Sequence, residues 1–249
     1  MIILVSNDDG IHAEGLAALE EGLRKIGDIY TVAPDRPQSL MSHALTLHRP
    51  LRVHEAGRNR FAVDGTPTDC VKLALTGLLP VRPHLVVSGI NKGPNLGDDI
   101  IYSGTVSAAI EAALLGLPAL AVSLVTFADF DFSPAAEFTT VLVSRIMENG
   151  MPRETLLNIN VPALPKDRLK GWQLTRMGKR HYSETIVERV DPRGAKYYWI
   201  GGDDLGFARD EGTDCVAVDQ GYVSVTPLQV DLTNYKLLQD RNLPGFAWP

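Results

Sequence analysis

A short apolar run that ends in two adjacent carboxylates constrains the fold of this 249-residue chain more than any other stretch. Residues 2–5 are four apolar residues in a row, three of them β-branched, as in a strand buried on both faces. The run stops at Asn7-Asp8-Asp9-Gly10, and an amphipathic stretch from Gly15 to Ile26 follows. A strand, an acidic turn and a helix in this order predict the first unit of an open α/β sheet, in which ligands bind at the carboxyl ends of the strands.

Asp8 and Asp9 are therefore the first candidate functional residues. Two carboxylates beside a buried strand are unfavourable unless something compensates their charge. A divalent cation such as Mg²⁺ or Mn²⁺ would do so, because these ions prefer oxygen ligands. The alternative is a solvated turn in which an Asp side chain accepts hydrogen bonds from the nearby backbone.

Alternating strand and helix patterns predict a doubly wound, mostly parallel sheet up to about residue 165. Further buried strands are expected at 29–33, 84–90, 119–123 and 156–161, short extended pieces at 45–53 and 61–63, and later helices at 106–115 and 135–148. The carboxyl ends of parallel strands share one edge, so the loops that follow them should lie near Asp8 and Asp9.

The loop after residue 90 carries a second set of candidates. Asn91 leaves a strand end as Asp8 does, and Gly93 and Gly97 allow backbone N–H groups to approach a ligand closely. Ser103-Gly104-Thr105 opens a helix, where free N–H groups and the helix dipole favour phosphate. A Ser or Thr in this place is usually only a helix cap. Because Asp8 and Asp9 are expected nearby, we favour phosphate binding at this helix start over a cap alone.

Two further features have more than one interpretation. The sequence Thr66-Pro67-Thr68-Asp69 is typical of a helix start, with Thr66 as N-cap and Pro67 in the first helical position, but a catalytic role fits it equally well. His12 and His43 lie in loops at the same sheet edge. Each could be a metal ligand or a general acid, although histidines in turns are more often surface residues.

Beyond residue 165 the alternation fails, which predicts an extension to the α/β core. Extended segments at 178–189 and 196–200 flank the strong turn sequence Asp191-Pro192-Arg193-Gly194, so a projecting β-hairpin arm is expected. Other expected elements are an extended piece at 172–176, a helix at 213–220, a strand at 222–227 and a terminal helix and tail after residue 234. A lone hairpin could not bury the aromatic residues of the extension, which indicates packing against a partner subunit: Tyr197, Tyr198, Trp199, Phe207 and Trp248.

The composition of the chain argues against several classes of protein. The net charge of −6 and the lack of a Lys- or Arg-rich run argue against nucleic-acid binding. No apolar run approaches the roughly 20 residues of a membrane span, and the N-terminus lacks the pattern of a signal peptide. Cys70 and Cys215 lack metal-site spacing and are expected to be core thiols. We therefore expect a soluble, cytoplasmic protein without nucleic-acid or membrane partners.

Several separated motifs together closely resemble the SurE (survival protein E) family, and they extend over nearly the whole chain. Five of them are Ser-Asn-Asp-Asp-Gly-Ile, Ala-Pro-Asp-Arg-x-x-Ser, Gly-Thr-Pro-x-Asp-Cys, Ser-Gly-Ile-Asn-x-Gly-x-Asn-Leu-Gly and Tyr-Ser-Gly-Thr-Val. Later segments resemble the family too: Leu-Asn-Ile-Asn-Val-Pro, Tyr-Trp-Ile-Gly and Gly-Tyr-Val-Ser-Val-Thr-Pro-Leu.

The resemblance implies a divalent-metal-dependent phosphatase with a Rossmann-like core that hydrolyses nucleoside monophosphates to nucleoside and phosphate. It implies a 5′-nucleotidase, with 3′-nucleotidase and polyphosphatase side activities, and one Mg²⁺ or Mn²⁺ ion per subunit. The family's metal ligands fall on Asp8, Asp9, Ser39 and Asn91. Its phosphate contacts fall on Asn95, Ser103, Gly104 and Thr105.

The resemblance also implies a homodimer or homotetramer with exchanged C-terminal segments. We therefore expect one domain, with the α/β core and active site at residues 1–165. The hairpin and the oligomerisation extension should occupy residues 166–249. One departure from the family pattern is visible, because Leu40 stands where the family usually has Gly. Leu adopts positive φ only at a cost, so this change bears on the geometry of Ser39.

The chemistry of these residues agrees with the resemblance. Carboxylate, hydroxyl and amide oxygens from three strand-end loops leave coordination positions for water and substrate. Asp8 and Asp9 are the candidate catalytic residues, with Asp8 as nucleophile or base because it is the first residue free to point into the cleft. Attack by Asp8, which forms an aspartyl-phosphate, and attack by metal-bound water both fit the sequence.

Two rival functions are compatible with an α/β sheet. A non-enzymatic nucleotide-binding or sensor module would bind ligand without releasing phosphate, and it leaves the Asp pair unexplained. A nicotinamide-dependent oxidoreductase needs Gly-x-Gly-x-x-Gly after the first strand, where this chain has Asn-Asp-Asp-Gly.

Overall fold

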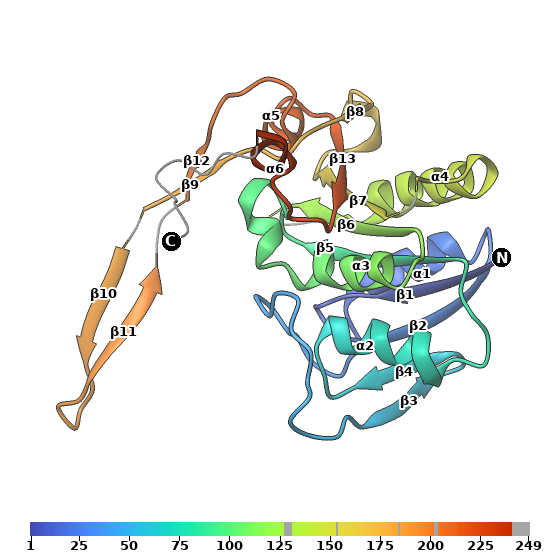
Figure 1. The fold of residues 1–249 in the computed structure, drawn as a ribbon, viewed down its shortest axis with the longest axis horizontal. Coiled ribbons are helices and arrows are strands. Elements are labelled where there is room, and N and C mark those ends of the chain that lie inside the picture. The colour runs from blue at the N-terminus through green and yellow to red at the C-terminus, as the bar shows by residue number, and fades with distance from the viewer. Residues whose placement is uncertain (127–130, 153, 184, 202–203, 241–249) are drawn as a thin grey trace.

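A nine-stranded sheet forms the centre of the protein in a computed structural model, which describes residues 1–126, 131–152, 154–183, 185–201 and 204–240 (Figure 1). The order across the sheet is β3-β4-β2-β1-β5-β6-β7-β13-β8. These strands are β1 (Ile2–Ser6), β2 (Asp28–Pro34), β3 (Val53–Gly57), β4 (Arg60–Val63), β5 (Leu85–Lys92), β6 (Ala119–Val125), β7 (Thr155–Pro162), β8 (Trp172–Leu174) and β13 (Val223–Gln229).

The parallel part of the sheet runs β4-β2-β1-β5-β6-β7. Numbered along the chain as parallel strands only, this is the order 3-2-1-4-5-6 of a Rossmann fold, which confirms the predicted α/β class. The chain winds outward in one direction from β1 to β2 and in the other from β5 to β6. The switch point of such a sheet therefore lies between β1 and β5, where ligands are expected to bind.

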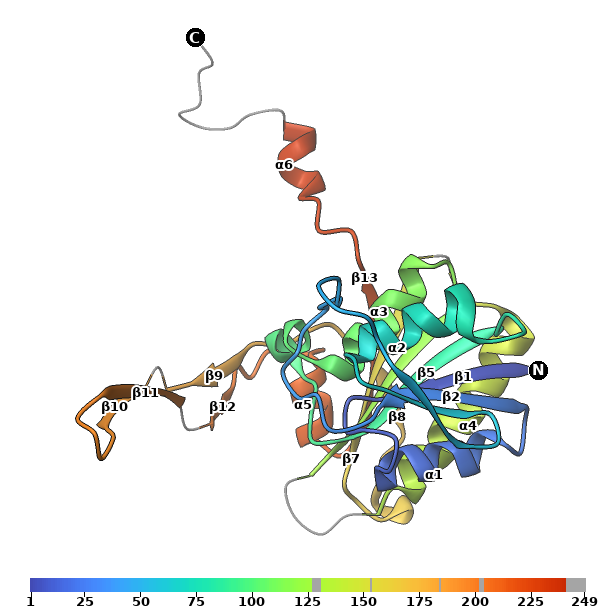
Figure 2. The same ribbon diagram turned by 90° about the horizontal axis from the view of Figure 1, so that it is seen from below.

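Helices cover both faces of the sheet (Figure 2). Helices α1 (Glu14–Leu23) and α4 (Ser133–Asn149) pack on one face, and α2 (Pro67–Leu73) and α3 (Gly104–Leu114) pack on the other. In β1, Val5 packs toward the first pair of helices and Leu4 toward the second, and both are fully buried. This explains the uninterrupted apolar run at the start of the chain.

The predicted extension adds to the same sheet before it leaves the body. β13 pairs antiparallel with β7 and parallel with β8. The hairpin of β10 (Thr185–Val190) and β11 (Lys196–Gly201) projects from the body as the predicted arm (Figure 1). The remaining elements are β9 (Arg180–Tyr182), β12 (Asp204–Phe207), α5 (Asp214–Asp219), α6 (Tyr235–Asp240), and the short turns of helix η1 (Ala74–Leu78), η2 (Gly97–Ile101) and η3 (Lys166–Arg168).

One predicted element is wrong. Of the expected extended piece at 45–53, only Val53 lies in a strand. Side chains rather than a strand ladder hold this segment, because Thr66 donates to the carbonyl of Ala44 and Asp69 accepts the N–H of Thr46. The predicted Trp248 contact lies outside the described residues. Among the residues that are described, no helix is both long and apolar enough to cross a membrane.

The Thr66 motif is a helix cap, as its spacing indicates. The Thr66 hydroxyl accepts the N–H of Asp69 at 3.1 Å, and the Asp69 carboxylate accepts the N–H of Thr66 at 2.9 Å. This reciprocal capping box satisfies two backbone donors that α2 cannot pair itself. Thr68, two residues later, is fully buried, and none of the described protein atoms hydrogen-bonds to its hydroxyl.

We predict opposite effects for the two threonines of this motif. Thr66→Ala removes the cap and should lower the free energy of unfolding by about 1–2 kcal/mol. Thr68→Val keeps the side-chain shape and removes an unpaired buried hydroxyl, so it should be neutral or stabilising. Urea unfolding of both variants checks this, and equal losses of stability would contradict the assignment of the cap.

Candidate active site

The acidic turn after β1 is held by Asn7, not by the two aspartates. The Asn7 side chain is fully buried, donates to the carbonyl of Gly10 at 3.0 Å and accepts the N–H of Gly10 at 3.2 Å. Gly10 has φ of 97°, and a Cβ there would lie 3.2 Å from the backbone of Arg36. Asn7 thus forms the turn, which leaves the carboxylates of Asp8 and Asp9 available for other partners.

Asp8 lies between the end of β1 and the beginning of α3. Its side chain accepts a hydrogen bond from the Thr105 hydroxyl at 2.5 Å, and the residue is 7% exposed. A Cβ on Gly104 would lie 2.7 Å from the Cβ of Asp8 and 3.0 Å from its Oδ2. Glycine at position 104 is therefore needed for the helix to come this close to the carboxylate.

Burial sets the proton affinity of both aspartates. The pKa of Asp8 is raised from 3.8 to about 6, mainly by desolvation and to a smaller degree by the Asp9 charge, and the hydrogen bond from Thr105 opposes this rise. Burial also raises the pKa of Asp9, opposed by a hydrogen bond from the N–H of Lys92 at 3.3 Å. Asp8 forms no ion pair with a Lys, Arg or His in the described part of the chain.

Two other strand-end loops meet the acidic turn. Asn91 lies at the end of β5, next to Lys92, and its amide nitrogen donates to the carbonyl of Gly93 at 2.9 Å. Its amide oxygen is therefore the atom that remains to bind a ligand. In the loop after β2, the N–H of Gln38 donates to the carbonyl of Asp8 at 2.8 Å, which places the exposed Ser39 beside the turn.

Leu40 has φ of 58°, in the left-handed region that glycine adopts most easily. The backbone conformation that glycine would favour is thus present here with a Leu side chain, which is 79% exposed. A Leu in this conformation puts strain into the backbone of the residue after Ser39 and an apolar side chain at the surface of the loop.

The Asn95 position is fixed by side chains that sequence analysis did not single out. Asn160 accepts the N–H of Asn95 and donates to its carbonyl, both at 2.9 Å, and Asn158 donates to the same carbonyl at 2.8 Å. The Asn95 amide nitrogen donates to the Ser123 hydroxyl at 2.7 Å. One signal was in the sequence: two Asn on the same face of an otherwise apolar buried strand need partners.

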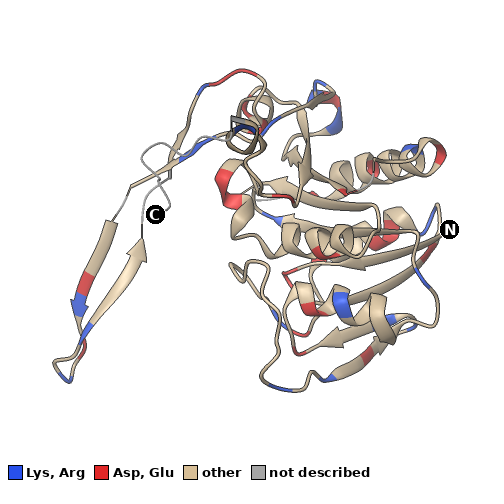
Figure 3. Cartoon of the chain, in the orientation of Figure 1, with Lys and Arg blue, Asp and Glu red and all other residues tan. Residues whose placement is uncertain are grey.

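Asp214 of α5 is a second residue that the sequence analysis missed. It is fully buried and accepts the backbone N–H groups of Gly97, at 2.8 Å, and Gly178, at 2.7 Å. The same loop is bound from the base of the arm, because Arg180 of β9 and the preceding Lys179 form ion pairs with Asp99 and Asp98 of η2. Figure 3 shows acidic residues on η2 and basic residues on the neighbouring chain at β9. The predicted extension is thus tied directly to the loop that contains Asn95.

The phosphate candidates at 103–105 begin α3, as predicted. The Ser103 hydroxyl caps the helix by accepting the N–H of Val106 at 3.1 Å. Of the two histidines, His43 lies 3.0 Å from Oε2 of Glu111 in α3, and Lys72 lies 3.0 Å from the other oxygen of this buried carboxylate. His12 is exposed.

The donor set fits a hard divalent cation. In the described part of the chain, no cluster of three or more His, Cys, Asp or Glu residues could hold a metal. The turn instead brings together two carboxylates with the amide oxygen of Asn91 and the loop of Ser39, all oxygen donors. A buried Asp8 with no ion-pair partner and a raised pKa is the kind of group that a cation would stabilise.

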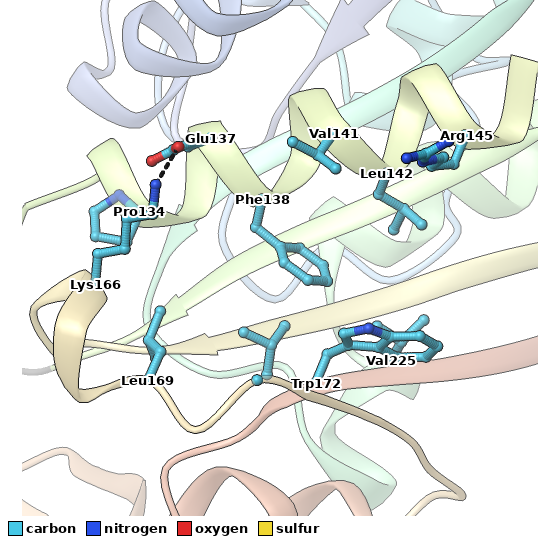
Figure 4. Close-up of a pocket in the computed structure, with 12 residues that line it drawn as sticks. Pro134, Glu137, Phe138, Val141, Leu142, Arg145, Lys166, Leu169, Trp172 and Val225 are labelled. Carbon is cyan, nitrogen blue, oxygen red and sulfur yellow. Dashed lines mark hydrogen bonds and ion pairs between the residues drawn. The ribbon is translucent and has the colours of Figure 1, made fainter.

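An apolar pocket is a separate feature. It has a volume of about 650 Å³ and lies between α4 and the strands β8 and β13, where Phe138, Leu142 and Trp172 line it (Figure 4). None of its lining residues is a predicted site residue.

Known proteins are similar to this chain over most of its length. The family model described as "Survival protein SurE" matches residues 3–184. A "5'-nucleotidase SurE" of Geotalea daltonii is 56% identical over 236 residues, which cover 94% of this chain and 95% of the relative. One of Geobacter metallireducens is 56% identical over 248 residues, which cover 99% and 98%. The crystal structure of the Sure protein from Aquifex aeolicus has a TM-score of 0.87 and 44% identity, covering 96% of this chain and 98% of that one.

Burial of Asp8 should make the metal-free protein less stable as pH rises. Its folded pKa of about 6 exceeds the ordinary 3.8, so the folded state holds the proton more tightly and stability falls between about pH 4 and 6. Asp8→Asn removes this penalty. In EDTA at pH 8 the variant should be more stable than wild type by up to about 3 kcal/mol, and the difference should shrink toward pH 4.

Urea unfolding at both pH values measures this difference. Asp167→Asn serves as the control, since Asp167 is exposed and should show no gain that depends on pH. A gain of the same size at pH 4 and pH 8 would mean that the charge of Asp8 is not its cause.

Proposed function

The chain belongs to the SurE family, and from this we infer that it is a 5′-nucleotidase, a phosphatase that hydrolyses nucleoside 5′-monophosphates to nucleoside and phosphate. The observation that carries the inference is the Asp8–Asp9 pair. It lies at the switch point of the sheet, with Asp8 against the N-terminus of α3. The 3′-nucleotidase and polyphosphatase side activities stay predictions.

We propose that the beginning of α3 and the Asn95 loop bind the phosphate group. Backbone N–H groups in the first turn of a helix have no partner within the helix and attract anions. Ser103 is the N-cap residue of α3, and Gly104 and Thr105 are the first two residues of the helix. Asn95 contributes its side-chain amide, of which one hydrogen is used by Ser123 and the other is left for a phosphate oxygen.

Asp8, Asp9, Ser39 and Asn91 would hold one divalent cation, and Mg²⁺ or Mn²⁺ suits their oxygen donors best. When bound, the cation would polarise the phosphoryl group and offset its negative charge. The hydrogen bonds from Thr105 and from the N–H of Lys92 orient the two carboxylates toward this role. Asp8 is our candidate for nucleophile or general base.

A panel of nucleotides tests this function. We expect phosphate release from nucleoside 5′-monophosphates, no release in EDTA, and rapid recovery when Mn²⁺ or Mg²⁺ is added. The far-UV circular dichroism spectrum should stay native in EDTA, because the apolar layers on both faces of the sheet hold the core together without the ion. Full activity after exhaustive chelation would remove the metal from the mechanism. Binding without phosphate release would favour the sensor module instead.

Single substitutions test the two carboxylates. Asp8→Asn and Asp9→Asn should each lower kcat at least about a hundredfold, the scale expected for loss of an electrostatic contact to the transition state. The exposed Asp167→Asn variant should keep normal turnover. Near-normal activity of Asp9→Asn would exclude Asp9 from the metal site.

We also propose that residues 166–249 act as an oligomerisation extension to the 1–165 core, in a homodimer or homotetramer with exchanged C-terminal segments. Exposed apolar side chains support this. Ile200 in the arm is 92% exposed and Leu232 before α6 is 95% exposed, and an isolated subunit would leave them in water. The cytoplasmic location expected from the sequence stays a prediction.

Removal of residues 231–249 should weaken this assembly. The cut leaves the register of β13 with β7 intact, since the last pair is Gln229 with Thr155. We therefore expect light scattering to show a smaller species whose far-UV spectrum is unchanged. Leu47→Ser is the control, because Leu47 is also an exposed apolar residue, at 87%, but lies in the α/β part of the chain at residues 1–165 and not in the extension. A truncated protein of unchanged size would refute the proposal.

A further inference from the structure

We propose that Asn158 and Asn160 of β7 are positioning residues for the reaction, because they hold Asn95 where its side chain can bind the substrate phosphate. The proposal rests on the phosphatase function inferred above and assigns two further residues to it. Neither residue would touch the substrate. Their effect passes through the backbone of Asn95, which lies in the loop between β5 and η2.

Asn160 pairs with Asn95 as a neighbouring strand would. Its Oδ1 accepts the N–H of Asn95 and its Nδ2 donates to the carbonyl of the same residue, each at 2.9 Å. Both backbone groups of one residue are thus bound by one side-chain amide, the exchange that a hydrogen-bonded pair makes in an antiparallel ladder. Asn158 adds a second donor to the carbonyl at 2.8 Å. Asn95 lies outside the sheet, but its backbone N–H and carbonyl are both paired as they would be in a strand of the sheet.

This pairing has a direct effect on the Asn95 side chain. Asn95 is only 7% exposed, and its amide nitrogen is already directed by the bond to Ser123. With the backbone and one amide hydrogen fixed, the second amide hydrogen has a defined direction. Farther along the loop, Asp214 holds the N–H of Gly97 at 2.8 Å, so the segment is anchored at both residues. A phosphate contact placed in this way needs no rearrangement on binding.

Stability alone does not explain Asn158. It is fully buried, and no described protein atom hydrogen-bonds to its Oδ1. A buried oxygen without a partner is unfavourable, and an apolar side chain of similar size would avoid that penalty. Asn158 sits among apolar neighbours in β7 and lies opposite Ala121 of β6. What it provides, and leucine cannot, is the N–H donor to Asn95.

A purely structural role makes a different prediction. If the two asparagines only satisfied a buried loop, their loss would lower the unfolding temperature and would affect all ligands of the site alike. If they position Asn95, phosphate binding should weaken while binding of the divalent cation does not. Among the described residues, the side chains of the two asparagines hydrogen-bond to Asn95 and to none of the proposed cation ligands Asp8, Asp9, Ser39 and Asn91, so the two effects can be separated.

Asn158→Leu and Asn160→Ala in the full-length protein test the proposal. For each variant we expect kcat/KM with adenosine 5′-monophosphate to fall about ten- to a hundredfold, the scale of a misplaced binding group. Calorimetry should show at least a tenfold weaker affinity for inorganic phosphate. The affinity for Mn²⁺ should stay within about twofold of wild type. If one variant does not fold, the other still provides the test.

Thr226→Val is the matched control. Thr226 lies opposite Asn158 in the sheet, is almost fully buried, and its hydroxyl lies 2.7 Å from that of Thr175. Its replacement removes a buried polar contact from the neighbouring strand without affecting Asn95. We expect a lower unfolding temperature, with kcat/KM and phosphate affinity within about twofold of wild type.

Two outcomes would overturn the proposal. One is phosphate affinity in Asn158→Leu and Asn160→Ala that stays within twofold of wild type. The other is a parallel loss of phosphate and Mn²⁺ affinity, which would mean general disruption of the site. A wild-type protein that releases no phosphate from any nucleotide would refute the proposed function. In that case the phosphate affinities alone would still decide whether the two asparagines position Asn95.

Discussion

The burial of a negative charge at the N-terminus of a helix is the constraint on which the rest of the site depends. Asp8 is almost inaccessible, and its carboxylate accepts a hydrogen bond from the Thr105 hydroxyl. Neighbouring residues are adapted to this. Asn7 makes the hydrogen bonds that hold the turn, so the two aspartates do not have to. Gly104 leaves room for the start of α3 beside Asp8, and the small side chains of Ala108 and Ala109 let α3 pack closely on the sheet. The unfavourable charge is concentrated at one place, the one where we propose that a cation and a phosphate bind.

The loops around this charge are held by individual hydrogen bonds rather than by regular structure. The backbone N–H of Gln38 donates to the carbonyl of Asp8, and side chains bind the backbone of the next loop, at Asn95 by Asn160 and at Gly97 by Asp214. Such loops can be rigid without being helices or strands, since each buried backbone group still finds a partner. The sheet therefore sets the positions of the strand ends, and a small number of polar groups set the direction of each loop.

Local patterns were sufficient to predict the sheet and the cap. The run at residues 2–5 and the spacing of Thr66, Pro67 and Asp69 act through neighbours in sequence, so they could be interpreted without a structure. The segment 45–53 was predicted as a short extended piece. Its actual partners are side chains about twenty residues away, at the start of α2. No local pattern contains that information.

The site residues divide in the same way. Asp8 and Asn91 could be proposed from the sequence because each comes at the end of a recognisable strand. Asn158, Asn160 and Asp214 were missed because their partners lie 63, 65 and 117 residues away along the chain. Leu40 is an intermediate case. The sequence identified it as unusual, but only the fold reveals that its backbone has φ of 58°.

The long reach of Asn160 and Asp214 also bears on how the protein is made. A chain that leaves the ribosome N-terminus first exposes its acidic turn and the start of α3 before the residues that fix the Asn95 loop have been synthesised. That loop can take its final form only when β7 has joined the sheet and α5 has docked. Long-range contacts of this kind form late, because their loop-closure entropy must be overcome first. The nascent chain should therefore gain a complete site only near the end of translation, when almost the whole protein is folded.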